Sequence, residues 1–206
     1  MNQHNRTAQR ADAVVSFWFG ALEKGFASAA NRKRWFAPDP DFDRAVATQF
    51  GDLLDSAATG ALNHWHQDAR GRLAFIIVTD QFSRQIHRGS ARAFATDAIA
   101  LRAARDGIER GHDRALQFDE RTFFYLPFEH AESNADQDTS VALFTALRDA
   151  TPPPFRALTE DTLRFAEQHR EIVRRFGRFP HRNVSLGRES TADELEFLRS
   201  ASRFGQ

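Results

Sequence analysis

The chain contains no cysteine, which excludes disulfides, thiolate chemistry and any zinc site that depends on Cys ligands. Lysine is confined to positions 24 and 33, so arginine carries nearly all of the positive charge. Tyrosine is almost absent, with one Tyr against 20 Phe. We therefore expect a core with much aromatic volume and few polar aromatic groups.

An excess of charge of either sign is also missing. Lys+Arg and Asp+Glu both number 28, so the formal net charge is zero. Proteins dedicated to binding nucleic acids or anionic membranes usually carry a basic excess, so we expect neither partner.

Long apolar runs are absent as well. No stretch approaches the roughly 18 consecutive apolar residues of a membrane span, and residues 1–20 lack the apolar region of a signal peptide. We therefore expect a soluble, cytoplasmic protein whose oligomeric state the sequence leaves open. Its length of 206 residues suits a single helical domain over residues 1–206, with a candidate subdomain junction at the proline-rich segment 151–155.

What the sequence does contain is helical periodicity over most of its length, which predicts an all-α fold. Short loops favour eight or nine helices in antiparallel pairs, as in a tetratricopeptide-like helical stack, although no strict repeat period is present. Residues 21–40 are expected to be irregular. The expected helices are 7–19, a short one around Leu62 and Trp65, and 41–57, 72–87, 91–110, 119–131, 136–149, 160–176 and 191–203.

Residues with cap chemistry support several of these boundaries. Gly20 is expected to end the first helix, Asp119 and Thr159 to cap two later ones, and Thr191 with Glu194 to form a capping box. Pro127 must kink or stop its helix because proline lacks the amide donor.

The segment 72–87 is the one around which the rest is expected to be organised. Its first half, Leu73 to Val78, is the most apolar run of the chain and should be among the most buried segments. Asp80, Arg84 and His87 then follow on one helical stripe. An apolar first half followed by a polar end predicts that this helix lies at the centre of the fold and that its end is functional.

Three polar clusters interrupt otherwise apolar patterns. The first, at the end of 72–87, can equally be a structural ion pair between Asp80 and Arg84 or part of a ligand site. The second follows Pro127, where carboxylates and an imidazole suit acid, base or metal-ligand roles, or where a neighbouring carboxylate satisfies the histidine. The clusters comprise Asp80, Gln81, Arg84, His87 and Arg88, and Glu129, His130 and Glu132.

The third cluster lies in a turn set by Gly177 and Pro180, and it displays Arg178, His181, Arg182 and Asn183. Arginine forks suit carboxylate or phosphate groups, so an anionic ligand is the natural partner. The alternative is that these arginines pair with carboxylates of other helices and fix the C-terminal region. His169 shares an apolar stripe with Phe165 and Ile172, so we interpret it as a partly buried core histidine.

Five motifs in order resemble the bacterial family of domain of unknown function 924. They are Val15–Gly20 (VSFWFG), Trp35-Phe36, Asp80–Arg88 (DQFSRQIHR), Tyr125–Glu132 (YLPFEHAE) and Arg174–Asn183 (RRFGRFPHRN). The resemblance implies an all-helical, tetratricopeptide-like and soluble protein, with no established reaction. The positions that match the polar motifs of the family are Asp80, Gln81, Arg84, Arg88, His130, Glu132, Arg178, His181, Arg182 and Asn183.

Our main hypothesis is that the three clusters converge on one pocket for a small anionic molecule or peptide. Asp80 or Glu132 would be the acid and His130 or His181 the base. The ligand would be bound by Gln81, Arg84, Arg88, Arg178, Arg182 and Asn183. The sequence has no phosphate-binding loop, dinucleotide fingerprint, nucleophile elbow or His-Glu-x-x-His motif, and this hypothesis includes no metal or cofactor.

Two alternatives remain open. One is a helical-repeat scaffold that binds a peptide or partner protein, with the aromatic side chains of Trp18, Trp35 or Trp65 exposed along a groove. The other is a metal-dependent hydrolase that uses His130, Glu132 and His181.

Overall fold

The computed structural model describes the backbone of residues 3–200 and the side chains of residues 9–199. This part of the chain is all-α, and its only strand-like feature is an isolated bridge between Glu23 and Phe26. None of its helices is long and apolar enough to cross a lipid bilayer. The helices are α1 Gln3–Phe19, α2 Ala29–Phe36, α3 Pro40–Ala58, α4 Ala69–Ile76, α5 Ser83–Ile86, α6 Asp97–Glu109, α7 Phe118–Glu129, α8 Asn134–Ala150, α9 Arg156–Phe176 and α10 Ala192–Ser200.

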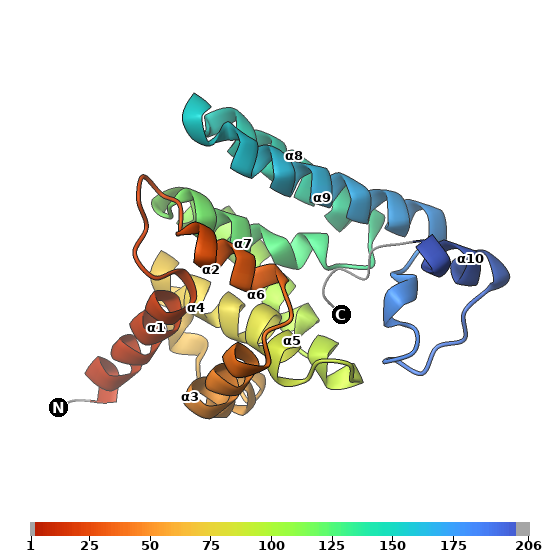
Figure 1. Ribbon diagram of the computed structural model, residues 1–206. Helices are drawn as coiled ribbons and strands as arrows, with labels where there is room; N and C mark the ends of the chain where they lie inside the picture. Colours follow the sequence, from red (N-terminus) through yellow and green to blue (C-terminus); the bar gives the residue numbers. More distant parts are fainter. Residues whose placement is uncertain (1–2, 201–206) are drawn as a thin grey trace.

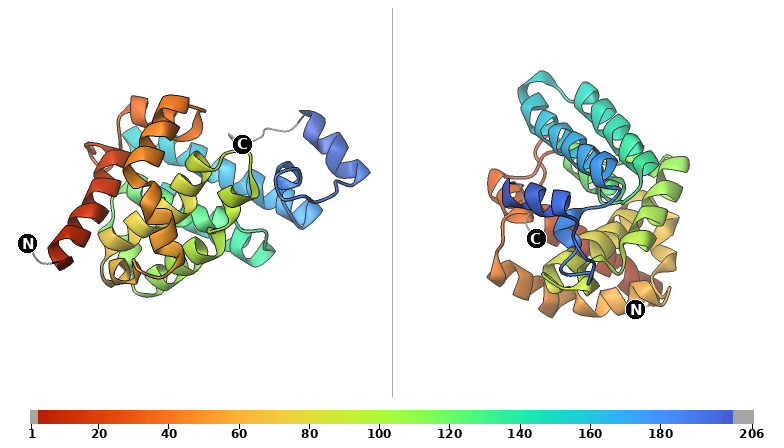
Figure 2. Two further views of the ribbon diagram at one scale, coloured as in Figure 1. Left: turned by 90° about the horizontal axis from the view of Figure 1, so that it is seen from below. Right: turned by 90° about the vertical axis from the view of Figure 1, so that its right-hand side faces the viewer.

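The helices form a lower body and an upper pair (Figure 1). Helices α8 and α9 run antiparallel and side by side, and α7 lies beneath them with its chain direction parallel to that of α9. Helices α1, α3, α4 and α6 form the body below, while α10 lies at the end of the molecule opposite α1 (Figure 2). The predicted all-helical fold is confirmed, whereas the tetratricopeptide-like stacking stays a prediction.

The segment predicted as one helix over 72–87 is continuous but not uniform. Between α4 and α5, residues Ile77–Phe82 form a π-helix, in which the amide of Ser83 donates to the carbonyl of Val78, five residues earlier. Two carbonyls here have additional donors: the Thr96 hydroxyl donates to the carbonyl of Thr79, and Arg84 Nη1 donates to that of Asp80 at 2.6 Å. Side chains from outside the turn thus support the widened geometry.

The burial predicted for this segment is confirmed. Residues Leu73 to Val78 are all at most 3% exposed, and burial continues through the polar residues Asp80 and Arg84. Aromatic rings surround the segment: Trp18 packs edge-on against Phe82 and Phe123, and Phe50 stacks on Phe82. The high Phe content of the sequence therefore fills the space around this central segment.

Several predicted boundaries are confirmed by their capping groups. Gly20 adopts a left-handed φ of +63° after α1, and its amide donates to the carbonyl of Ser16. At α10, the Thr191 amide donates to Glu194 and the Glu194 amide donates to Thr191 Oγ1, which is the expected capping box. The predicted end of this helix near Arg203 lies outside the described residues.

Other boundaries were wrong for local reasons. The segment predicted as irregular contains α2, whose first turn is capped by Ser28. The helix predicted over 91–110 is a 3-10 turn, Ala91–Phe94, followed by α6. Thr159 lies inside α9 rather than before it, and α7 passes through Pro127 before it ends at Glu129.

Asp119 does not cap α7, a role taken by Gln117. It is a buried side chain that accepts a hydrogen bond from the amide of Ala27 at 2.7 Å and pairs with Arg32. The first turn of α7 thereby fixes the segment that carries α2, and α2 forms one wall of the site described below.

We predict that Phe123→Ala lowers the free energy of unfolding by about 3–5 kcal/mol, because it leaves a cavity among packed rings. Phe123 is fully buried, whereas Phe165 is 43% exposed. Phe165→Ala is the matched control and should cost less than about 1 kcal/mol. Urea denaturation measures both values, and equal losses would contradict this description of the core.

Candidate functional site

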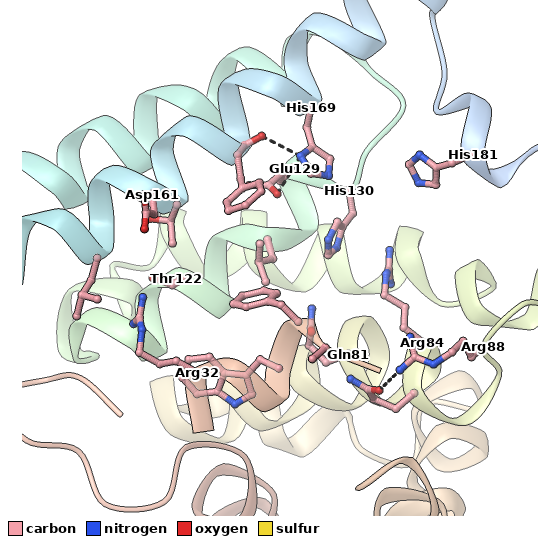
Figure 3. A pocket seen from close by; sticks show the side chains of 18 of the residues that line it. Arg32, Gln81, Arg84, Arg88, Thr122, Glu129, His130, Asp161, His169 and His181 are labelled. Atoms are coloured by element: carbon pink, nitrogen blue, oxygen red, sulfur yellow. Dashed lines mark hydrogen bonds and ion pairs between the residues drawn. The ribbon is translucent and has the colours of Figure 1, made fainter. Parts of the chain in front are cut away.

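A cavity of about 450 Å³ lies between α2, the π-helix and α5, α7, α9 and the 3-10 turn Pro180–Arg182 (Figure 3). Its volume falls within the usual range for small-molecule sites, roughly 300–1,000 Å³. The lining residues are Arg32, Trp35, Phe36, Ala37, Gln81, Arg84, Gln85, Arg88, Thr122, Leu126, Glu129, His130, Leu158, Asp161, Thr162, Phe165, His169, His181 and Arg182.

Helical spacing explains how two of the walls arise. On α9, Leu158, Asp161, Phe165 and His169 recur every three or four residues, so they share one face. Helix α7 presents Thr122, Leu126 and Glu129 in the same way, with His130 at its C-cap. The polar clusters of segments 80–88 and 181–182 close the cavity from the other sides.

The centre of the polar end is a contact between Asp80 and His130. His130 Nδ1 lies 2.8 Å and 3.0 Å from the two carboxylate oxygens of Asp80. Gln81 Nε2 also donates to this carboxylate at 2.6 Å, and Arg84 Nη1 lies 3.2 Å away. Burial alone would raise the pKa of Asp80, but Arg84, His130 and Gln81 outweigh it and hold the pKa below its usual value. Asp80 is therefore a buried carboxylate anion.

This contact fixes the chemical form of His130. Burial lowers the pKa of His130, and that effect outweighs the opposite effect of Asp80, so the imidazole is neutral at neutral pH. A neutral ring that faces a carboxylate through Nδ1 carries its proton there and donates it to Asp80. Its Nε2 is then an acceptor in a residue that lines the cavity.

Glu129 and His169 form a second contact in the same cavity. His169 Nδ1 lies 2.8 Å from the carbonyl of Phe165 and 3.3 Å from Glu129 Oε1. Burial, followed by the charge of Asp80, raises the pKa of Glu129 to about 8, and burial lowers the pKa of His169 to about 3. Both groups are uncharged at neutral pH, so their contact is not an ion pair.

His169 therefore has a different place from the one predicted. It is buried, as expected of a core histidine, but it lines the cavity beside His130, with ring centroids 6.4 Å apart. Its position four residues after Phe165, on the face shared with Leu158, was visible in the sequence. That stripe was interpreted as core because the sequence does not reveal a cavity against it.

Three of the predicted arginines line the cavity, and they are held differently. Arg84 donates both terminal nitrogens to Asp97, at 2.8 Å and 3.0 Å, and Arg88 pairs with Asp43 at 3.1 Å. Arg182 makes a longer contact, with its Nη1 3.4 Å from the carboxylate of Asp97.

Arg182 is the most weakly satisfied of these cations. Its guanidinium lies between two rings, 4.7 Å from the Phe94 centroid and 4.5 Å from that of Phe179. Its Nε is buried and has no hydrogen-bond partner among the described residues. Burial, followed by the charge of Arg84, lowers its pKa to about 10, so it remains a cation at neutral pH.

The structure does not bring every predicted site residue to the cavity. Glu132 accepts hydrogen bonds from Arg188, at 2.7 Å and 2.9 Å, and from the amide of Phe179 at 2.8 Å. Arg178 pairs with Glu194 at 2.7 Å, and Asn183 donates to Glu194 at 3.3 Å. For Arg178 and Asn183, these contacts support the alternative in which the third cluster fixes the C-terminal region.

The metal-dependent alternative lacks its ligand set in the described part of the chain. There, no group of three or more His, Asp or Glu side chains is arranged to hold a metal ion. Glu132, one of the three expected ligands, is engaged by Arg188.

The scaffold alternative predicted exposed tryptophans, and this prediction was wrong. Trp18, Trp35 and Trp65 are all buried. Trp35 does line the cavity, but its indole Nε1 donates to the carbonyl of Trp18 at 2.9 Å, and its ring packs on Phe123.

We predict that Glu129→Gln changes how stability depends on pH. The folded-state pKa of Glu129, about 8, lies above its ordinary value of 4.5. Between these values the folded protein binds one more proton at this site, so Glu129 makes the free energy of unfolding fall as pH rises, by about 1.4 kcal/mol per pH unit. Glu129→Gln removes this contribution and should be increasingly more stable than wild type from pH 5 to pH 8.

Glu132→Gln is the matched control, three residues away. Burial would raise the pKa of Glu132, but hydrogen bonds from Arg188 and Phe179 outweigh it and lower the pKa. This substitution should not give a gain that grows with pH. Urea denaturation at several pH values measures both effects, and parallel curves for Glu129→Gln and wild type would contradict the neutral state of Glu129.

Comparisons with known proteins agree with this fold. A family model described as bacterial protein of unknown function (DUF924) matches residues 14–202. A solved structure of a protein of unknown function, ATU0120 from Agrobacterium tumefaciens, is 39% identical, covers 95% of this chain and 99% of its own, and superposes with a TM-score of 0.80. The comparison with curated proteins gives no match. The resemblance carried by the five motifs is confirmed, and the chain belongs to the DUF924 family.

Proposed function

We propose that the cavity binds a small carboxylate- or phosphate-bearing molecule and that His130 transfers a proton to or from it. The observation that carries the proposal is the contact between His130, which lines a cavity of ligand size, and the fully buried carboxylate of Asp80 behind it. A histidine oriented by a buried carboxylate is a recurrent arrangement for general acid–base chemistry.

Asp80 would have two effects on His130. It holds the proton on Nδ1, which leaves Nε2 as the basic nitrogen in the cavity. When Nε2 accepts a proton, from the ligand or from a water molecule that attacks it, the anionic carboxylate stabilises the imidazolium that forms. The bonds from Gln81 and Arg84 keep the carboxylate ionised and in place.

Arg182 is the group best suited to bind the anion. Arg84 and Arg88 already share their charge with Asp97 and Asp43, so they shape the wall more than they attract a ligand. Arg182 has only a long contact with Asp97, together with an Nε that lacks a partner in the described chain. An oxyanion near His130 would supply a hydrogen-bond acceptor for this buried donor.

We predict that an anionic ligand raises the melting temperature of the wild-type protein and that Arg182→Gln removes about half of that effect or more. A ligand at a hundred times its dissociation constant stabilises by about 2.7 kcal/mol. A lost charge-assisted hydrogen bond costs about 1.5–3 kcal/mol, which corresponds to roughly 10- to 150-fold weaker binding. A thermal-shift screen with carboxylates, sugar phosphates and inorganic phosphate provides the measurement.

Arg178→Gln is the control, because Arg178 pairs with Glu194 outside the cavity. It should shift the melting temperature of the free protein without reducing the response to the ligand. If no compound in the screen stabilises the wild type, or if Arg182→Gln and Arg178→Gln respond equally, the proposed anion site is incorrect.

A further inference from the structure

The two ends of the cavity differ in chemistry, and the helix directions show which residues lie at each. Helices α7 and α9 run in the same direction (Figure 1), so their first turns lie at one end and their last turns at the other. His130 and His169 come late in these helices and lie near each other. Figure 3 shows Arg84, Arg88, His130 and His181 on one side, with Arg32, Thr122 and Asp161 on the other.

The end formed by the first turns is mostly apolar. Leu158 lines it from the first turn of α9, and Trp35 and Phe36 pack on Phe123 of α7, with centroids 4.6 Å and 6.2 Å apart. Leu126, on α7 four residues before His130, continues this apolar lining towards the opposite end. The two charged residues at the apolar end already have partners. Arg32 pairs with Asp119, and Asp161 lies 2.9 Å from Arg164. This end therefore presents carbon surface and no charge in need of a counter-ion.

Two of the apolar side chains that line the cavity are unusually exposed for their size. Phe36 is 57% exposed and Phe165 is 43% exposed, and both line the cavity. Large apolar side chains that line a cavity and are partly exposed favour a ligand with apolar surface of its own, because its burial removes that area from water. From Leu158 to His169 the rise of α9 is about 16 Å, so such a ligand can be several carbons long.

The opposite end limits the charge of the ligand. Its histidines and Glu129 are uncharged at neutral pH, and its three arginines face an equal number of carboxylates. These six groups are Arg84, Arg88, Arg182, Asp43, Asp80 and Asp97. Because the charges balance, each negative charge on a ligand adds an uncompensated charge to a buried site. A singly charged head fits this end better than a doubly charged one.

We infer that the ligand is an amphipathic monocarboxylate, with its carboxylate beside His130 and Arg182 and its acyl or aryl tail against Leu126, Leu158 and Phe165. This inference rests on the proposed function, because it names the class of molecule that the anion site takes. Beyond anion binding, the inference requires that the ligand has an apolar tail.

Isothermal titration calorimetry at pH 7 with acetate, butyrate, hexanoate and octanoate tests the tail. Burial of each added methylene should tighten binding by up to about fourfold, so the dissociation constant should fall steadily along the series. Octyl phosphate, which is largely a dianion at this pH, should bind more weakly than octanoate. 1-Octanol, which has the same tail and no charge, should bind at least tenfold more weakly.

Paired variants locate the tail. Phe165→Ser should reduce the gain in affinity per methylene, whereas Leu195→Ser should leave it unchanged. Leu195 is a suitable control because it is 53% exposed, on α10, and does not line the cavity. Arg182→Gln should weaken every carboxylate in the series by a similar factor and leave the gain per methylene intact.

The outcomes separate the inference from the proposed function. If acetate or inorganic phosphate binds through Arg182 but affinity does not rise with chain length, the tail is wrong and the anion site stands. If octyl phosphate binds more tightly than octanoate, the inferred monocarboxylate head is wrong, whereas the tail and the anion site stand. If 1-octanol binds as tightly as octanoate, or if neither phosphate nor any carboxylate binds, both the inference and the proposed function fail.

Discussion

The carboxylate of Asp80 is fully buried and remains charged, and much of the site depends on how that charge is balanced. An isolated buried carboxylate would cost several kcal/mol. Here three neighbours compensate it: the guanidinium of Arg84, the amide of Gln81 and the imidazole of His130. Because these groups come from both α7 and the central helical segment, the same charge ties the two elements together and sets the orientation of the histidine.

The π-helical turn makes this arrangement possible. A uniform α-helix through residues 77–82 would rotate the residues that follow by a different amount, and Asp80 and Arg84 would leave it at other angles. The wider turn is supported from outside by the hydroxyl of Thr96 and from its own side by Arg84, which binds both the carbonyl of Asp80 and the carboxylate of Asp97. The geometry of the π-turn and the charged cluster therefore depend on each other, and a substitution that alters one is expected to disturb the other.

The sequence predicts well those features that depend on nearby residues. The αL glycine after α1, the capping box of α10 and the burial of Leu73 to Val78 follow from spacing and residue type. Helix α2 was missed because its few residues carry no apolar repeat, and it is held by tertiary contacts of Arg32 and Trp35. The π-turn was missed because part of its support, the hydroxyl of Thr96, comes from outside the segment.

Part of the candidate site could likewise be predicted from the sequence, and part could not. Asp80, His130 and Arg182 stood out because they interrupt apolar patterns, but nothing local shows that Asp97 contacts both Arg84 and Arg182.

Long-range ¹H–¹⁵N spectra of the histidine rings directly test the claim that Asp80 fixes the tautomer of His130. At pH 7, His130 should be the neutral tautomer with its proton on Nδ1, and Asp80→Asn should abolish that preference. A proton on Nε2, or a spectrum unchanged by Asp80→Asn, would contradict it.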